Sequence, residues 1–308
     1  MRKYIISDIH GDGNVYKSIM GYLDNISKEE KIELYINGDL FDRGQDSAEV
    51  LLDVIKRIKD NKFKIIYLGG NHELLMYQIY DRRRKGLSVS YFNEWYDNGG
   101  WITDELLEEN LDYDKDKILE VADFVGDLPI YHKFEEKING KNIMLVHSAS
   151  VSEIEKHPDA KIKDNDDFVN WCVWTREYDP FIPFRCRIGN DNYFSIVGHT
   201  PNNNPCGYEY NEKEDYLNID GGCSFYVSGY FDFDHVPLVE VLNEKLRILT
   251  FNNNNEIVYG NYFINGKSNP FTAEELDTAR GKINHNLKLE KLIKNEDGAV
   301  YYEKGQSR

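Results

Sequence analysis

FKIIYLGGNHELL, residues 63–75, runs from an apolar strand-like segment through two glycines into Asn71, His72 and a series of helix formers. In an open α/β sheet, ligands are held at the carboxyl ends of the strands, so polar side chains at such a turn are candidates for chemistry. A simpler interpretation is a glycine-rich turn in which Asn71 caps the helix, since asparagine is a favoured N-cap. The rest of the sequence has to separate these two interpretations.

The residues before this stretch alternate between strand and helix signals. Short apolar runs at 3–7, 32–37 and 63–68 predict strands, and helical spacing at 14–23 and 47–58 predicts a helix between each pair. The order βαβαβ predicts a parallel sheet with right-handed crossovers.

The residues after this stretch predict a larger α/β fold. Residues 80–128 are charged and contain several helical pieces, so we expect a helical insertion over the sheet. More short strands are predicted further on, at 142–147, 193–199, 216–220, 236–242 and 246–251. We expect them to form a second sheet, packed face to face with the first. One domain over residues 1–265 would then be followed by a polar C-terminal tail over residues 266–308.

Composition limits the partners of the protein. The chain has 308 residues, of which 41% are hydrophobic, and this is enough for a sizeable core. Its formal net charge is −17, whereas binding to nucleic acid or to an anionic membrane needs clustered basic residues. We therefore expect neither partner, and any recognition of phosphate must be local.

The cysteines and the N-terminus predict a cytoplasmic protein. Cys172, Cys186, Cys206 and Cys223 lack both the spacing of a zinc site and the density of a disulfide scaffold, so reduced and mostly buried thiols are expected. Only four residues, three of them apolar, separate the first basic pair from Asp8, too few for a signal peptide, and no run of 18 apolar residues occurs.

Polar residues follow five of the predicted strands, in the segments SDIHG, NGDLFDRG, GGNHE, VHSAS and VGHTP. Each segment alone can be an ordinary turn, but together they collect six possible metal ligands: Asp8, His10, Asp39, Asn71, His147 and His199. This mixture of carboxylate, amide and imidazole suits manganese, iron or zinc. Two such ions about 3.5–4 Å apart, bridged by one carboxylate, can drive an in-line phosphoryl displacement.

These motifs, in this order, resemble those of the calcineurin-like metallophosphoesterases. DRG and GNHE narrow the resemblance to the phosphoprotein phosphatase branch. NEWYDNGGWIT, DLPIY, VWTRE and YLNIDGG are similar to segments of the small bacterial and phage serine/threonine protein phosphatases. The resemblance covers about residues 1–230. It implies a two-sheet α/β/β/α sandwich with a helical insertion, and a catalytic role for the domain over residues 1–265.

The resemblance also implies a metal site. Asp8 and His10 would hold the first ion and Asp39 would bridge, while the second ion would be held by Asn71, His147 and His199. A hydroxide between the two ions would be the nucleophile. Manganese is the expected ion, with iron or zinc as alternatives.

Four further residues gain roles from the same resemblance. His72 would be the general acid that protonates the leaving group, and Asp42 would orient it and stabilise its charged form. Arg43 and Arg176 would bind the phosphoryl oxygens, because a guanidinium can donate to two of them at once.

The function implied is that of a metal-dependent phosphomonoesterase acting on phosphoserine and phosphothreonine in proteins, or on a small phosphoester. A hydrolase of dinucleoside polyphosphates is the first alternative. Arg43 is followed by Gly44 and Gln45, without the proline frequent in those enzymes, which favours the protein phosphatase only slightly. A non-catalytic module that binds phosphoproteins is less favoured, since His72 and all six ligands are present. The physiological substrate and the oligomeric state stay open.

Overall fold

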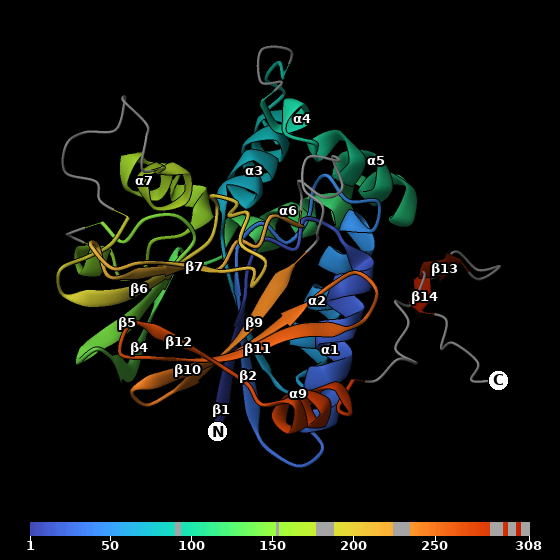
Figure 1. The fold of residues 1–308 in the computed structure, drawn as a ribbon. Coiled ribbons are helices and arrows are strands. Elements are labelled where there is room, and N and C mark those ends of the chain that lie inside the picture. The colour runs from blue at the N-terminus through green and yellow to red at the C-terminus, as the bar shows by residue number, and fades with distance from the viewer. Residues whose placement is uncertain are drawn as a thin grey trace.

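Two stacked β-sheets with helices on their outer faces make up the body of the protein (Figure 1). The computed structural model describes residues 1–89, 94–151, 154–176, 188–223 and 235–283, and the backbone of 292–294 and 300–302. Within these residues, the α/β sandwich predicted from the sequence is confirmed.

The first sheet has the strand order β12-β11-β10-β9-β1-β2-β3. Its strands are β1 (Arg2–Ile6), β2 (Ile32–Asn37), β3 (Lys64–Leu68), β9 (Val236–Leu242), β10 (Lys245–Phe251), β11 (Ile257–Ile264) and β12 (Lys267–Pro270). As predicted, β1, β2 and β3 are parallel neighbours. Apolar residues fill these strands because both faces of the sheet are covered.

The assignment of residues 236–242 and 246–251 to the second sheet was wrong. These residues form β9 and β10, and β9 pairs antiparallel with β1 in the first sheet. Alternating apolar residues fit either sheet equally well, and the pairing partner is more than 200 residues away in the sequence.

Residues beyond 265 also take part in the fold. β12 pairs with β11, and the following helix α9 (Ala273–Arg280) packs on the same strand. Near the C-terminus, β13 (Leu292–Lys294) and β14 (Val300–Tyr302) form a separate antiparallel pair.

The second sheet has the order β4-β5-β6-β8-β7. Its strands are β4 (Tyr131–Ile138), β5 (Lys141–Val146), β6 (Tyr193–Val197), β7 (Glu209–Asn211) and β8 (Tyr216–Asn218). β5, β6 and β8 run parallel, so their carboxyl ends share one edge.

Helices cover the sandwich and form the insertion. They are α1 (Gly13–Ile26), α2 (Ser47–Asp60), α3 (Asn71–Arg84), α4 (Glu94–Asp97), α5 (Gly100–Asn110), α6 (Lys115–Gly126) and α7 (Asp167–Trp174), with short 3-10 turns at Ile154–Lys156 and Ile162–Asp164. The insertion predicted over residues 80–128 contains α4, α5 and α6. In Figure 1, α1 and α2 lie along the first sheet, while α7 lies beyond the second.

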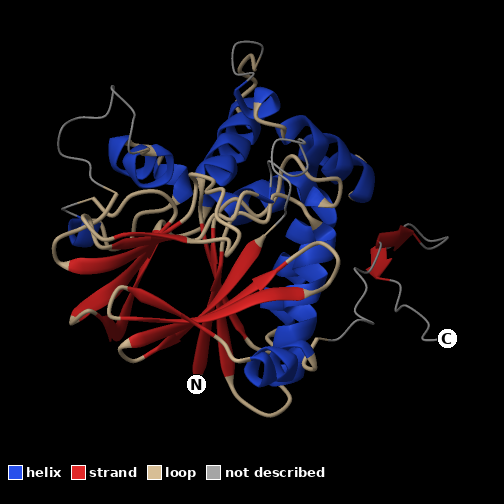
Figure 2. Cartoon of the chain, viewed as in Figure 1, coloured by secondary structure: helices blue, strands red, loops and turns tan. Residues whose placement is uncertain are grey.

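Alternation along the strands builds two apolar layers. In β1, Ile5 points between the sheets, where it clusters with Leu145 and Ile196 of the second sheet. Its neighbours Tyr4 and Ile6 point to the other face and cluster with residues of α1 and α2. Successive side chains of a strand point to opposite faces, so one strand contributes to both layers. The loops at the strand ends gather along one edge of the two sheets (Figure 2).

Candidate active site

The segments singled out in the sequence meet at this edge. Asp8 and His10 follow β1, Asp39 follows β2, and His147 and His199 follow β5 and β6. The remaining predicted residues lie in the same loops, in the first turn of α3, or just after α7: Asp42, Arg43, Asn71, His72 and Arg176. Eight of the ten predicted residues are buried, Arg43 is half-buried, and Arg176 is exposed.

The backbone of these loops is unusual. Left-handed φ angles, from 47° to 71°, occur at six of the predicted site residues: Asp8, His10, Asp39, Asp42, Arg43 and His199. This conformation is uncommon for residues other than glycine, and strained residues of this kind cluster at functional sites. The packing is also close, because a Cβ atom on Gly38 would lie 2.7 Å from His147 Nδ1 and from the backbone of Gly70.

Asp39 belongs to two groups of possible metal ligands. Its Oδ2 lies 3.5 Å from His10 Nε2, in a group that also contains His72. Its Oδ1 lies 3.3 Å from His147 Nε2, in a group that also contains His199. Asp39 therefore offers one carboxylate oxygen to each group, as a ligand shared by two ions would have to do.

The side chain of Asn71 lies against the second group. Its Oδ1 accepts hydrogen bonds from His147 Nε2 at 3.1 Å and from His199 Nδ1 at 2.9 Å. The helix cap considered in the sequence is not formed by Asn71, because Gly70 occupies the N-cap and Asn71 is the first residue of α3. The amide is thus turned toward the two histidines.

Asp8 lies at the site but outside both groups. Its Oδ1 accepts a hydrogen bond from the backbone N–H of His199 at 3.1 Å. Its Oδ2 and His199 Nε2 are buried and have no hydrogen-bond partner among the described residues. Buried polar atoms without a partner are costly, so these two atoms are suited to bind a cation.

Asp220, which the sequence analysis did not single out, adds another carboxylate. Burial, followed by repulsion from Asp220, raises the pKa of Asp8 well above its ordinary value. Burial and Asp39 in turn raise the pKa of Asp220 to about 6. Asp220 lies just after β8, so the same search for acids at strand ends could have found it.

Two carboxylates act on the imidazole of His147. Burial disfavours a charge on His147, but the carboxylates of Asp39 and Asp8 outweigh it and raise the pKa of His147 to about 10. His147 then donates from both ring nitrogens, from Nδ1 to the Asn37 carbonyl at 2.8 Å and from Nε2 to Asn71. Positive charge is therefore favoured at His147, and the carboxylate, amide and imidazole donors of the site fit divalent metal ions.

His72 is held by a second buried carboxylate, Asp42. The Nδ1–H of His72 donates to Asp42 Oδ2 over 2.6 Å, and both side chains are fully buried. Asp42 also accepts hydrogen bonds from Trp95 Nε1 at 2.7 Å and from the hydroxyl of Thr103. These contacts fix the ring of His72 and its protonated nitrogen, Nδ1.

Trp95 and Thr103 were missed as site residues. Both lie in the segment NEWYDNGGWIT, which the sequence analysis quoted without giving either residue a role. Their part depends on the approach of α4 and α5 to the loop after β2, and no local pattern indicates it.

Glu73 was also missed, and it ties two loops together. Its carboxylate accepts hydrogen bonds from the backbone N–H groups of Asp39, Leu40 and Gly70 and from the Tyr67 hydroxyl. Glu73 is completely buried, so these four donors depend on it. It sets the position of Asp39 relative to the start of α3.

The two predicted arginines lie on different sides of the site. Arg43 donates from Nη1 to His10 Nε2 at 3.2 Å and from Nη2 to His72 Nε2 at 3.0 Å. Burial, followed by the charge of Arg176, lowers the pKa of His199 well below its ordinary value. Both guanidinium groups are thus close to the histidines of the site.

A sequence model of the calcineurin-like phosphoesterases matches residues 1–229, so this chain belongs to that family. It is a metallophosphoesterase-type hydrolase, and its fold is the one that carries a dinuclear site for divalent metal ions.

Curated relatives match only a part of the chain. A symmetrical bis(5'-nucleosyl)-tetraphosphatase of Buchnera aphidicola subsp. Schizaphis graminum is 33% identical over 95 residues, which are 31% of this chain and 33% of that protein. The enzyme of the same name from Erwinia tasmaniensis is 37% identical over 81 residues, 26% of this chain and 27% of that protein. The matches thus span a third or less of these relatives.

Solved structures resemble the chain at low identity. A protein serine/threonine phosphatase from Saccharomyces cerevisiae has a TM-score of 0.49 at 16% identity, with 82% of this chain and 80% of that chain covered. A cold-active protein tyrosine phosphatase has a TM-score of 0.46 at 16% identity, with 89% and 80% covered. Similarity at this level says nothing about the substrate.

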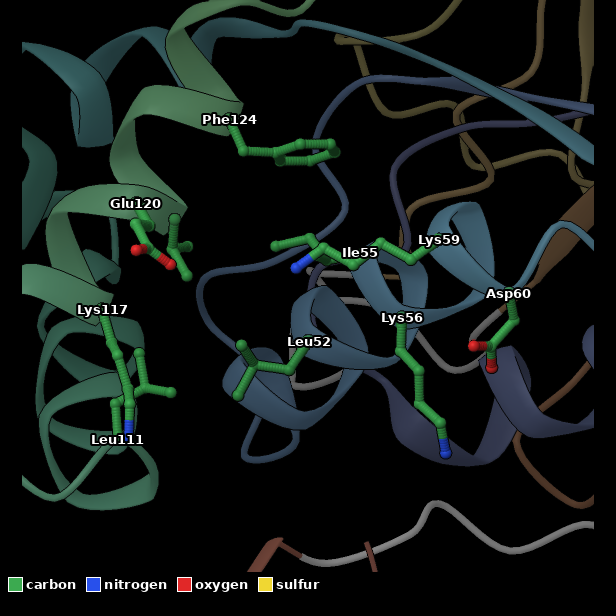
Figure 3. Close-up of a pocket in the computed structure, with 10 residues that line it drawn as sticks. Leu52, Ile55, Lys56, Lys59, Asp60, Leu111, Lys117, Glu120 and Phe124 are labelled. Atoms are coloured by element: carbon green, nitrogen blue, oxygen red, sulfur yellow. The ribbon is translucent and has the colours of Figure 1, made fainter. Parts of the chain in front are cut away.

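A pocket of about 440 Å³ lies away from this site, between α2 and α6 (Figure 3). Leu52 and Ile55 of α2 face Phe124 of α6 across it, and none of the predicted site residues lines it. Within the described residues, no helix is both long enough and apolar enough to span a membrane.

Of the four cysteines, Cys172 and Cys223 are buried and Cys206 is half-buried. None of these three is in a disulfide, and Cys186 lies outside the described residues.

Proposed function

We propose that the protein is a metal-dependent phosphomonoesterase that hydrolyses phosphoserine and phosphothreonine in proteins. The observation that carries the proposal is the buried pair of His72 and Asp42 beside the ligand groups that share Asp39. A serine or threonine alkoxide is a strongly basic leaving group and needs a proton as it departs. A fixed imidazole at this place supports such a substrate.

The ligand groups support a site for two divalent ions. Asp8 and His10 would hold the first ion, Asn71, His147 and His199 the second, and Asp39 both. When bound, the ions supply Lewis acidity to the phosphoryl group and lower the pKa of water. We propose manganese, with iron or zinc as alternatives, since all three accept this mixture of donors.

The protein's own side chains bind and orient the substrate. Arg43 and Arg176 bind phosphoryl oxygens, whose charge at neutral pH is about −1.5 to −2. Asp42 keeps the proton of His72 on Nδ1, so that Nε2 faces the site and can carry the proton for the leaving oxygen. In the free protein, Arg43 donates to this Nε2, and the phosphoryl group would compete for the same guanidinium.

A second candidate is the hydrolysis of dinucleoside polyphosphates, which the names of the curated relatives favour. Two observations weigh against it. A nucleoside diphosphate is a weakly basic leaving group that gains less from His72, and a net charge of −17 repels a tetraphosphate. The reduced cysteines and the charge suit a cytoplasmic enzyme, whose partners we propose to be phosphoproteins rather than nucleic acid or membrane.

A panel of substrates tests the proposal. Purified protein is incubated with manganese and, in separate reactions, a phosphoserine peptide, a phosphothreonine peptide and a symmetrical dinucleoside tetraphosphate. The proposal expects the highest kcat/KM on the phosphopeptides. A higher kcat/KM on the dinucleoside tetraphosphate would replace the proposal with the second candidate.

A further inference from the structure

A second pocket, of about 290 Å³, borders the candidate active site. Residues of α3, α4 and α7, the elements labelled in Figure 1, and Thr175 just after α7 line it: Leu75, Gln78, Glu94, Asn170, Trp171, Trp174 and Thr175. None of these residues has a role in the chemistry proposed above.

The helices that line this pocket also carry, or adjoin, residues of the active site. α3 begins with Asn71 and His72 and supplies Leu75 and Gln78 in its next turns. Glu94 directly precedes Trp95, which holds Asp42.

The third wall touches the metal site directly. The ring of Trp174 packs edge-on against His199, with 5.8 Å between the ring centres. A substrate whose phosphate lies at His72 and His199 could therefore extend over this pocket.

The polar lining of the pocket includes two side-chain amides and a carboxylate. The amide N–H of Gln78 donates to Asn165 at 2.7 Å, and that of Asn170 donates to the Asp166 carbonyl at 2.9 Å. Each of these amides also carries a carbonyl oxygen, which can accept a hydrogen bond. Glu94 is exposed and adds a carboxylate.

Two indole rings supply the rest of the lining. Trp171 is 38% exposed, and Trp174 is half-buried. Aromatic faces and a carboxylate together attract a cation, through cation–π contacts and an ion pair.

We propose that this pocket binds the side chain of a lysine or arginine near the phosphorylated residue of a polypeptide substrate. The proposal rests on the proposed function and names a preference within it. Leu75 and Gln78 lie three and six residues beyond His72, which is about 4.5 and 9 Å along the helix. An extended polypeptide covers about 3.3–3.6 Å per residue, so a basic residue about one to three positions from the phosphoresidue would lie within reach of the pocket.

The charge of the protein agrees with this choice of ligand. A body with a net charge of −17 attracts a basic peptide and repels a polyanion, and a basic flank offsets part of the charge of the phosphate. A nucleobase could also stack on an indole ring, so nucleotides form a separate arm of the test.

The test compares phosphoserine peptides that differ at one position. Arginine or alanine is placed two or three residues before or after the phosphoserine, and kcat/KM is measured for wild type and for Glu94→Gln. Glu105→Gln is the control, since Glu105 is an exposed carboxylate of α5 that does not line the pocket. Nitrophenyl phosphate, which is too small to reach the pocket, reports on the chemistry alone.

Wild type and the control are expected to prefer an arginine peptide by about 3- to 30-fold. The preference should appear mainly in KM, shrink with added salt and largely vanish in Glu94→Gln. Trp171→Leu should reduce it as well, with turnover of nitrophenyl phosphate unchanged in all variants.

Three results would overturn the proposal in distinguishable ways. Equal kcat/KM for all peptides, or a preference that Glu94→Gln retains, overturns the role of the pocket and leaves the proposed function standing. No hydrolysis of any phosphopeptide, with nitrophenyl phosphate still turned over, overturns both. A loss in Glu94→Gln confined to the dinucleoside tetraphosphate assigns the pocket to a nucleobase instead.

Discussion

Replacing His72 with asparagine is expected to affect substrates according to their leaving group. His72 is fully buried, and its Nδ1 lies 2.6 Å from Asp42, so Nε2 is directed into the site. A positioned general acid contributes about 10²- to 10⁴-fold. We expect His72→Asn to lose this factor in kcat/KM on a phosphoserine peptide. On nitrophenyl phosphate the loss should be much smaller, because nitrophenolate departs without a proton.

Asp42→Asn provides a graded comparison. It keeps the hydrogen-bonded shape but removes the charge, and charge-assisted hydrogen bonds are about twice as strong as neutral ones. A loss of about 1–1.5 kcal/mol corresponds to roughly tenfold on the phosphoserine peptide.

The assay is the ratio of the two kcat/KM losses, measured on protein whose manganese content is known from elemental analysis. The structure places His72 in one group with His10 and Asp39, so a role as metal ligand is the competing explanation. Equal losses on both substrates, or a missing metal ion in His72→Asn, would refute the role of general acid.

Three further predictions concern residues around this pair. Asparagine tolerates the left-handed φ of residue 39, so Asp39→Asn should fold normally. It should weaken manganese binding by more than about 100-fold. A normal manganese content by elemental analysis would exclude Asp39 as a bridging ligand. Trp95→Phe removes one hydrogen-bond donor to Asp42. It should lower kcat/KM about 5-fold on the phosphoserine peptide but little on nitrophenyl phosphate. Wild-type kcat/KM on both substrates would show that the indole N–H is dispensable. Glu73→Ala leaves four donors without their acceptor and should lower the free energy of unfolding in urea by about 3 kcal/mol, whereas a loss under about 1 kcal/mol would contradict the structure.

Local patterns were enough to predict the central part of the fold. The apolar runs at 3–7, 32–37 and 63–68 have helices between them, and that order alone dictates a parallel sheet. The sheet to which β9 and β10 belong could not be predicted in this way. The pairing of β9 with β1, which also brings β10 into the first sheet, joins residues at opposite ends of the domain, and an alternating pattern does not identify its partner.

In the site, too, residues indicated by local patterns could be predicted, and residues brought in by distant packing could not. Asp39 and Asn71 could be found because polar residues at strand ends meet at one edge of a sheet. Trp95 and Thr103 could not, since they reach Asp42 only after α4 and α5 have packed over it. Asp220 follows the same rule as Asp39, but it was counted within the strand predicted over residues 216–220, whereas β8 ends at Asn218.

The dependence of activity on bound manganese tests the two-metal site most directly. Protein freed of metal by exhaustive chelation is titrated with manganese, and hydrolysis of a phosphoserine peptide is followed together with the number of ions bound per chain. Because Asp39 has one oxygen in each ligand group, we expect two ions per chain, no turnover without metal, and full activity only when both ions are bound. Full turnover by metal-free protein, or after a single bound ion, would contradict the account.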